Sequence, residues 1–238
     1  MPELDQVNRM TNTGVESKIE EIKNLVENIR DPRLKKQTFD LLNSTILNKD
    51  YTLSQASKKV HHSYMGGLID HTLSTTKIGL ALSEQVESMY KYKVDKDTII
   101  SSCLLHDVFK PFTYEESDNS INSPLGLYME HLILITIKLT QNEFPLKVIH
   151  AVAAHHGDSG PVRPETLEAM IVHLADYVDS KLNGDILRKA KAIYQEEVKT
   201  GAEPKDILIA LEMFSKRAEK EGEAERKFRE LFSEKNKN

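Results

Sequence analysis

Apolar residues recur at helical spacing through most of this 238-residue sequence, and this pattern restricts the fold more than any other feature. Side chains three or four positions apart lie on one face of an α-helix, so the pattern predicts helices that bury one face. No segment shows the alternation of polar and β-branched residues that is typical of a strand. The sequence therefore predicts an all-α fold, a single helical bundle of about eight or nine helices.

Proline and capping residues mark where several of these helices begin. Asp31-Pro32 and Ser123-Pro124 each pair a capping side chain with proline at the first helical position, and Pro145 opens another helix. The first thirteen residues are polar, and we expect them to be frayed. The predicted helices cover residues 14–30, 32–48, 68–90, 96–105, a segment that starts at residue 123 and carries residue 131, 145–154, 164–182, 184–199 and 204–233.

The composition favours a globular protein that stays in the cytoplasm. No apolar run approaches the roughly 20 residues that span a bilayer, and the polar, acidic N-terminus lacks the apolar core of a signal peptide. The single cysteine, Cys103, is most simply a small buried apolar residue. The net charge of −5 and the absence of tryptophan argue against a nucleic-acid binder, and we expect no membrane partner.

All nine histidines lie between His61 and His173. Imidazole and carboxylate side chains hold borderline transition metals, so this concentration indicates a metal site. A single buried histidine is usually a core residue satisfied by a hydrogen bond, whereas burying a whole set without partners costs several kcal/mol. The candidate metal ligands, in chain order, are His71, His106, Asp107, His131, His155, His156 and Asp176. A structural role is equally open for the other four histidines, which are His61, His62, His150 and His173.

The ordered set fits two cations that share one carboxylate. His106 and Asp107 follow a predicted helix, where the backbone can turn both side chains toward one cluster, and the two oxygens of Asp107 can bridge two metals. One sorting gives the first metal His71, His106, Asp107 and Asp176, and gives the second metal Asp107, His131, His155 and His156. This ligand set favours Fe, Mn, Co, Ni or Zn over Mg or Ca.

A dinuclear site of this kind predicts phosphoryl chemistry. Two metals about 3.5–4 Å apart clamp a phosphate oxygen and activate a bridging water. We therefore expect one or two divalent transition metals per chain, with Fe, Mn or Co preferred and Ni or Zn open. The substrate expected for such a cationic site is an anionic phosphoester.

The same residues resemble a known family. The HD-domain metal-dependent phosphohydrolase superfamily has a similar order of motifs, which here are HHSYMGGLIDHTLS (residues 61–74), the dipeptide HD, a downstream histidine, HHG and PETLEAMIVHLADYVDS (residues 164–180). The closer match is to the HD catalytic domain of bacterial 3′→5′ exoribonucleases. The resemblance implies a catalytic core at residues 58–183, with 1–57 as a helical extension packed on the core and 184–238 as C-terminal helices of the same domain.

The resemblance also implies an activity, because small HD proteins of this length commonly act on small phosphoesters. We therefore expect a phosphodiesterase that hydrolyses a small phosphodiester, such as a 2′,3′-cyclic one, with metal-activated water. Three alternatives stay open: a 3′→5′ exoribonuclease or nucleotidase acting on short RNA, a non-catalytic module that binds metal or nucleotide, and a di-iron oxygenase. The amphipathic terminal helices are also compatible with a homo-oligomer.

The sequence departs from the family pattern at several points. Phe109 replaces the glycine of the HD-x-G-K element, and the loop DSGPVRP is shorter than in the exonucleases. Residues 1–60 show helices in place of the exonucleases' nucleic-acid-binding OB module, which weakens a role in processing long RNA. Gly67 stands where trimetal relatives carry a glutamate, so two metals or one are expected.

Three residues are candidates for the chemical step, namely Asp107, Lys110 and His62. Lys110 and Arg163 are cations suited to phosphate contact, and a solvated surface position is equally open for each. His62 resembles a family position near the substrate, which implies a general acid that protonates the leaving oxygen.

Two residues of the 164–182 segment are candidates for substrate binding beside Lys110 and Arg163. His173 and Asp179 lie one helical turn before and after Asp176, so the three share a face. His173 would orient a metal ligand, and Asp179 would bind substrate or His173. Tyr64 and Tyr128 could stack on an aromatic ring, although core packing is the simpler expectation for both.

Overall fold

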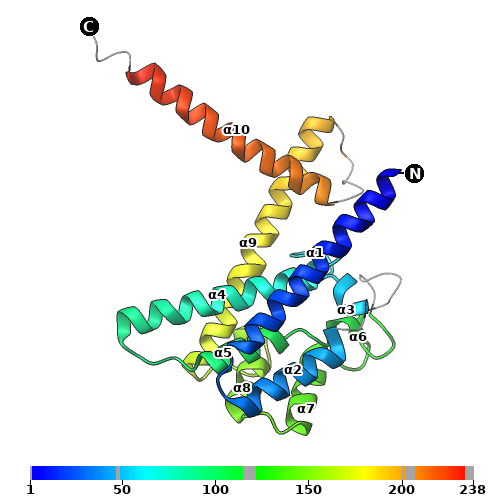
Figure 1. Ribbon diagram of the computed structural model, residues 1–238, viewed down its shortest axis with the longest axis vertical. Helices are drawn as coiled ribbons and strands as arrows, with labels where there is room; N and C mark the ends of the chain where they lie inside the picture. Colours follow the sequence, from blue (N-terminus) through cyan, green and yellow to red (C-terminus); the bar gives the residue numbers. More distant parts are fainter. Residues whose placement is uncertain (1, 47–48, 115–121, 200, 202–206, 234–238) are drawn as a thin grey trace. The chain divides into compact units, whose positions relative to one another are not determined.

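The computed structural model of the protein describes residues 2–46, 49–114, 122–199, 201 and 207–233 (Figure 1). These residues form helices and loops, with one isolated antiparallel bridge between Tyr114 and Asn122 and no strand in the described part of the chain. The all-α prediction is therefore confirmed. The chain divides into two compact units, residues 1–181 and 182–238. The sequence predicts one domain made of an extension (1–57), a catalytic core (58–183) and C-terminal helices (184–238), and this division stays a prediction.

The helices of the described residues follow one another with short connections. They are α1 (Pro2–Glu27), α2 (Pro32–Ile46), α3 (Lys49–Leu53), α4 (Gly67–Tyr90), α5 (Lys96–Leu105), α6 (Lys110–Thr113), α7 (His131–Gln141), α8 (Leu146–Ala153), the 3-10 turn η1 (Gly157–Ser159), α9 (Leu167–Val198) and α10 (Ile207–Ser233). Helix α9 runs from the first unit into the second, and α10 belongs to the second unit. None of these helices combines the length and apolar character that a bilayer crossing requires.

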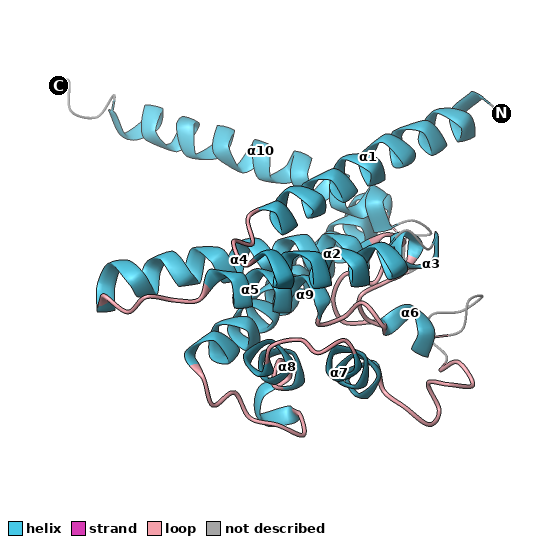
Figure 2. Cartoon of the chain, turned by 60° about the horizontal axis from the view of Figure 1, so that its bottom comes forward, coloured by secondary structure: helices cyan, strands magenta, loops and turns pink. Residues whose placement is uncertain are grey.

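The core of the first unit is centred on α5. This helix packs against α2, α4 and α8, and Figure 2 shows α7 and α8 lying side by side below it. Its residues between Thr98 and Leu105 are all buried, so α5 is apolar or small on every face rather than amphipathic. The polar groups Ser101 and Thr38 are paired across α5 and α2 at 2.8 Å. A helix buried on all sides ends inside the protein, and its C-terminus therefore delivers the next residues to the interior.

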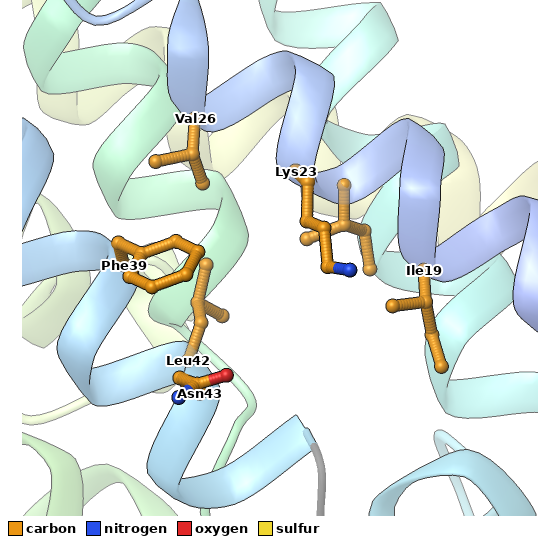
Figure 3. Close-up of a pocket in the computed structure, with 7 residues that line it drawn as sticks. Ile19, Lys23, Val26, Phe39, Leu42 and Asn43 are labelled. Carbon is orange, nitrogen blue, oxygen red and sulfur yellow. The ribbon is translucent and has the colours of Figure 1, made fainter.

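Helix α1 covers α2 and α4 with one apolar face. Val26 and Ile19 on α1 face Phe39 and Leu42 on α2 around a small, mainly apolar pocket (Figure 3). Two ion pairs fasten α1 to α4: Lys18 Nζ lies 2.5 Å from Asp70 Oδ1, and Lys77 Nζ lies 2.6 Å from Glu21 Oε1. The N-terminal helix is thus tied to the helix that carries His71.

Three predicted helix boundaries are wrong. The first helix begins at Pro2 rather than near residue 14. The helix expected from Ser123 begins at His131, because Ser123 Oγ instead accepts the Gly126 N–H and donates to the Phe112 carbonyl, which makes a turn. The helices expected at 164–182 and 184–199 are one continuous helix, α9, since an isolated glycine weakens a long helix without having to end it.

Candidate metal centre

Asp107 lies at the centre of the site because α5 ends immediately before it. His106 caps α5, donating its backbone N–H to the Ser102 carbonyl, and the chain then turns so that Lys110 N–H reaches the Asp107 carbonyl at 3.0 Å. The side chains of His106 and Asp107 are each only 1% exposed. This turn points two adjacent side chains into one cluster. In an uninterrupted helix the same two side chains would point about 100° apart.

The Oδ2 oxygen of Asp107 faces two histidines. His71 Nε2, from α4, and His106 Nε2 each lie 3.3 Å from Oδ2, and these two nitrogens are 3.1 Å apart. Asp176 Oδ1, from α9, lies 3.2 Å from His71 Nε2 and 4.0 Å from His106 Nε2. One carboxylate oxygen of Asp107 and three other side chains therefore surround a single point.

The Oδ1 oxygen of Asp107 faces a second group of histidines. His131 Nε2, from the first residue of α7, lies 3.2 Å from Oδ1, and His155 Nε2 lies 3.8 Å from it. The ring of His156 is 4.1 Å from that of His155 and 5.3 Å from that of His131, measured between centroids. Nitrogen atoms of His131, His155 and His156 all lie within 4.8 Å of one another, close enough to hold one cation.

The hydrogen bonds of the Nδ1 atoms define which ring nitrogen of these histidines is free. His106 Nδ1 lies 2.8 Å from the Cys103 carbonyl, and His155 Nδ1 lies 2.7 Å from the Val152 carbonyl. His71 Nδ1 lies 2.6 Å from Asp179 Oδ2. Carbonyl and carboxylate oxygens only accept, so each Nδ1 donates its N–H and each neutral ring carries its lone pair on Nε2.

These lone pairs point at other acceptors rather than at donors. A site fits a metal when such buried acceptors lack a hydrogen-bond donor. Asp107 Oδ1, His131 Nε2 and His155 Nε2 are buried without a hydrogen-bond partner among the residues the structure describes. Leaving buried polar atoms unpaired costs about 1–3 kcal/mol each. Divalent transition metals bind imidazole lone pairs and carboxylate oxygens, and each Nδ1–H anchored on oxygen is the usual outer support of such a ligand. The donor set therefore fits one or two cations.

The electrostatics of the centre point the same way. Burial opposes protonation of His71, yet the carboxylates of Asp107 and Asp176 beside its ring raise its pKa well above the usual range. Burial also disfavours the ionised form of Asp107, but the charges of His106 and Lys110 hold the pKa of that carboxyl well below the usual range. The carboxylates thus stay ionised and attract positive charge, which a bound cation would supply in place of the proton on His71.

Burial and positive neighbours favour the neutral form of two histidines in the second group, His155 and His156. Burial and the charge of His106 lower the pKa of His155 well below its usual value, and burial likewise lowers the pKa of His156. A neutral imidazole is the form that binds a metal, so both rings are ready to act as ligands near neutral pH.

Lys110 lies inside the centre, whereas Arg163 lies outside it. Lys110 Nζ is 2.5 Å from Asp107 Oδ2 on a side chain that is only 10% exposed. Burial disfavours its charge, but Asp107 outweighs burial and raises the pKa of the lysine. Arg163 is exposed and pairs with the equally exposed Asp158 at 3.3 Å. The structure thus brings the first of the two predicted phosphate contacts to the cluster and leaves the second on the surface.

His62 and Asp179 lie behind His71. His62 Nε2 and His71 Nδ1 contact the same oxygen, Asp179 Oδ2, at 2.9 and 2.6 Å. His62 Nδ1 is 3.1 Å from the hydroxyl of Tyr64, which donates to Asp70 at 3.0 Å. Sequence spacing alone did not indicate this contact with His71, because Asp179 comes 108 residues later in the chain.

His173 supports the second group from behind. Its Nδ1 donates to the backbone carbonyl of His155 at 2.7 Å, and its ring lies against Gly157. Tyr128, expected in the core, is instead 88% exposed. His150 accepts the Glu165 N–H on its Nε2 at 3.1 Å, outside the metal-binding groups of histidines found among the described residues.

Sequence reasoning did not select His61, yet the structure places it against the cluster. Its ring centroid is 5.0 Å from that of His71. Burial, with the positive charges of His71 and Lys110, lowers its pKa to about 3. The adjacent pair His61-His62 was the available signal, since two neighbouring histidines outside a regular helix can both reach one site.

The fold and the centre together define a class: an all-α protein in which separate helices bring histidines and aspartates to a buried, cation-binding cluster. Comparison with known proteins agrees. The family described as "HD domain" matches residues 68–181. The dihydroneopterin 2′,3′-cyclic phosphate phosphodiesterase of Methanocaldococcus jannaschii is 37% identical over 183 residues, which are 73% of this chain and 74% of that protein.

A second relative is more distant. The 3′-5′ exoribonuclease YhaM of Shouchella clausii is 26% identical over 176 residues, which are 69% of this chain and 53% of that protein. The present chain therefore spans about half of the exoribonuclease. None of the solved structures compared with the chain gives a significant match. The chain belongs to the HD-domain superfamily of metal-dependent phosphohydrolases, and it is an enzyme of that class.

Proposed function

We propose that this enzyme is a phosphodiesterase that opens a small 2′,3′-cyclic phosphodiester. The observation that carries the proposal is the 37% identity, over about three quarters of both chains, to a phosphodiesterase of that specificity. The preferred substrate is accordingly dihydroneopterin 2′,3′-cyclic phosphate or a compound with the same cyclic ester. Asp107, with histidines facing each of its oxygens, supports the dinuclear chemistry that such hydrolysis uses.

We assign the metal ligands to two sets that share Asp107. The first is His71, His106, Asp107 Oδ2 and Asp176, and the second is His131, His155, His156 and Asp107 Oδ1. Five imidazoles with two carboxylates suit Fe, Mn or Co, with Ni or Zn as further candidates. Metal analysis of protein purified without oxygen tests this assignment.

When bound, the cations would supply polarisation of the phosphate and a more acidic water. Lys110 would neutralise the charge that grows on the phosphate oxygens, because its ammonium group stays protonated beside Asp107. Asp179 and His62 would hold the His71 ring so that Nε2 faces the cluster. The general-acid role of His62 and the phosphate contact of Arg163 stay predictions.

The test is hydrolysis of dihydroneopterin 2′,3′-cyclic phosphate and of 2′,3′-cyclic nucleotides by the parent and by Asp107→Asn. We expect metal-dependent ring opening by the parent and a loss of at least about 100-fold, equivalent to about 2.7 kcal/mol of the activation barrier, in the variant. Asp158→Asn is the matched control, because Asp158 is exposed and its ion pair with Arg163 lies outside the metal centre. Equal activity in Asp107→Asn would contradict the proposal.

Short RNA is the second candidate substrate, supported by the 26% identity to an exoribonuclease. An end-labelled oligoribonucleotide in the same assay decides between the two. Stepwise shortening from the 3′ end with no opening of cyclic phosphates would favour this candidate. The homo-oligomer expected from the terminal helices stays a prediction, which light scattering tests.

A further inference from the structure

The loop between α3 and α4, residues 54–66, is built to hold His61 in place. Ser57 Oγ accepts the backbone N–H groups of Val60 and His61, each at 3.0 Å, and donates to the His61 carbonyl at 2.9 Å. The Ala56 N–H donates to the carbonyl of His62, the residue after His61, at 3.2 Å. Both sides of the His61 backbone are therefore fixed by hydrogen bonds within the loop.

This loop adopts an unfavourable backbone conformation at His62. Its φ angle is +44°, in the left-handed region that residues other than glycine rarely adopt. The start of α4 also packs so tightly on it that a Cβ at Gly67 would lie 2.0 Å from the His62 carbonyl oxygen. Strained backbone of this kind persists where the surrounding structure enforces it, and it concentrates at functional sites.

A short relay fixes the orientation and tautomer of the His61 ring. His61 Nε2 lies 3.3 Å from Ser180 Oγ, and Ser180 Oγ donates to Asp176 Oδ1, also at 3.3 Å. A hydroxyl carries one proton, and the ionised carboxylate only accepts, so Ser180 accepts the proton of His61 Nε2–H. The neutral His61 ring therefore carries its lone pair on Nδ1.

That lone pair has no protein partner. His61 Nδ1 is buried and makes no hydrogen bond in the described part of the chain. Ligand atoms of His61, His62 and His71 lie within 4.8 Å of one another. His62 is already engaged, since its two ring nitrogens contact Asp179 and Tyr64. Of the two loop histidines, His61 is thus the one with an unused acceptor, and its ring lies 5.0 Å from that of His71 between centroids.

We propose that His61 is a further metal ligand, binding through Nδ1 on the side of the centre formed by His71 and Asp176. This inference rests on the proposed metal centre and adds to it a ligand from outside the seven-residue set. It gives a reason for the strained loop: hydrogen bonds between Ser57 and the His61 backbone, with close packing at Gly67, hold an eighth ligand near the site. A core histidine would instead use both of its nitrogens in hydrogen bonds.

The experiment compares cobalt binding by the parent, His61→Phe and His61→Asn. Phenylalanine keeps the ring and removes both nitrogens, whereas the asparagine Oδ1 stands near the position of Nδ1. We measure the Kd for Co2+ by competition with a chromogenic chelator, and the visible absorption bands of bound Co2+, which respond to its coordination. We expect His61→Phe to raise the Kd at least tenfold and to alter the bands, and we expect His61→Asn to stay nearer to the parent.

His150→Phe is the matched control, because His150 lies on the same unit and accepts a backbone N–H away from the cluster. It should bind Co2+ like the parent. Circular dichroism of the metal-free proteins checks the fold. If His61→Phe does not fold, His61→Gln replaces it with the same expectation, since its amide lies beyond the Nδ1 position.

Two outcomes would overturn the inference. In the first, His61→Phe, or its replacement, keeps the Kd and the spectrum of the parent. In the second, His61→Asn loses as much affinity as His61→Phe, which would mean that the contact with Ser180 matters and the Nδ1 lone pair does not. A parent that binds no cation would contradict the proposed function itself. A parent that binds Co2+ as tightly as His61→Phe would contradict only the role of His61, so the two failures are distinguishable.

Discussion

His71 Nδ1 lies 2.6 Å from Asp179 Oδ2, and both side chains are buried. The carboxylate holds the proton on Nδ1 and leaves the Nε2 lone pair toward Asp107 and Asp176. A carboxylate behind a ligating histidine also raises the basicity of its free nitrogen. Helix α9 thus contributes to the centre twice, through Asp176 at the cluster and through Asp179 behind it.

Replacing Asp179 with alanine should therefore weaken metal binding without removing a predicted ligand. Loss of such an outer partner typically lowers metal affinity by about 10- to 100-fold. We expect a Kd increase in this range for Asp179→Ala in a chelator competition assay. Asp185→Ala, on the same helix, is the control, because Asp185 is exposed and pairs with Arg188. Equal affinities in the two variants would contradict the role of Asp179.

Gly157 should resist substitution, because its backbone and its surroundings both require glycine. Its φ angle is +59°, and a Cβ would lie 2.3 Å from Cε1 of His173, the ring that bonds the His155 carbonyl. We expect Gly157→Ala to cost about 1–3 kcal/mol of unfolding free energy and to weaken metal binding. Chemical denaturation with and without metal measures both effects.

The control for this prediction is Gly201→Ala, because a Cβ at Gly201 would meet no atom within 4 Å. This variant should keep the stability of the parent to within about 0.5 kcal/mol. A Gly157→Ala protein as stable as Gly201→Ala would show that the His173 ring moves aside at no cost.

The sequence predicts the elements that carry the centre, because their signals are local. The helical period at residues 68–90 and 96–105 and the end of the latter helix before His106 are close to the observed α4 and α5. The order of His71, His106, Asp107 and the later histidines is what the family shares. Local pattern and resemblance therefore agree at these positions.

Other features could not be predicted because they depend on contacts between distant residues. The bond between His62 and Asp179 joins residues 117 positions apart, and Ser180 meets His61 over 119 positions. The turn at Ser123 also depends on a partner outside the turn, the Phe112 carbonyl, 11 positions earlier. The Ser-Pro pair predicts a helix start there, but the same serine side chain can either cap a helix or close a turn.

Cys103 should be chemically silent in the folded protein. It is fully buried on α5 against α4, where a Cβ at Gly79 would lie 3.2 Å from its Sγ. Burial raises the pKa of the thiol far above its usual value, and the thiolate is the reactive form. A thiol reagent at pH 8 should label less than about a tenth of the native protein within the time that labels the unfolded chain completely. Rapid native labelling, with the fold intact by circular dichroism, would show that the packing of α4 on α5 opens readily.

The stability of the metal-free protein should fall in acid partly through Asp179. Burial disfavours its ionised form, but hydrogen bonds from His62 and His71 outweigh burial and hold the pKa of Asp179 below its usual value. A carboxyl whose pKa is lower in the folded state stabilises the protein above the unfolded pKa of about 3.9, and this contribution is lost as the pH falls toward the folded pKa. Unfolding free energies of the parent and of Asp179→Asn, measured in urea between pH 5 and pH 2, should therefore converge as the pH falls. Uptake of one proton by Asp179 would make the slopes of unfolding free energy against pH differ by up to about 1.4 kcal/mol per pH unit between the two proteins. Parallel curves for the parent and Asp179→Asn would contradict the lowered pKa of Asp179.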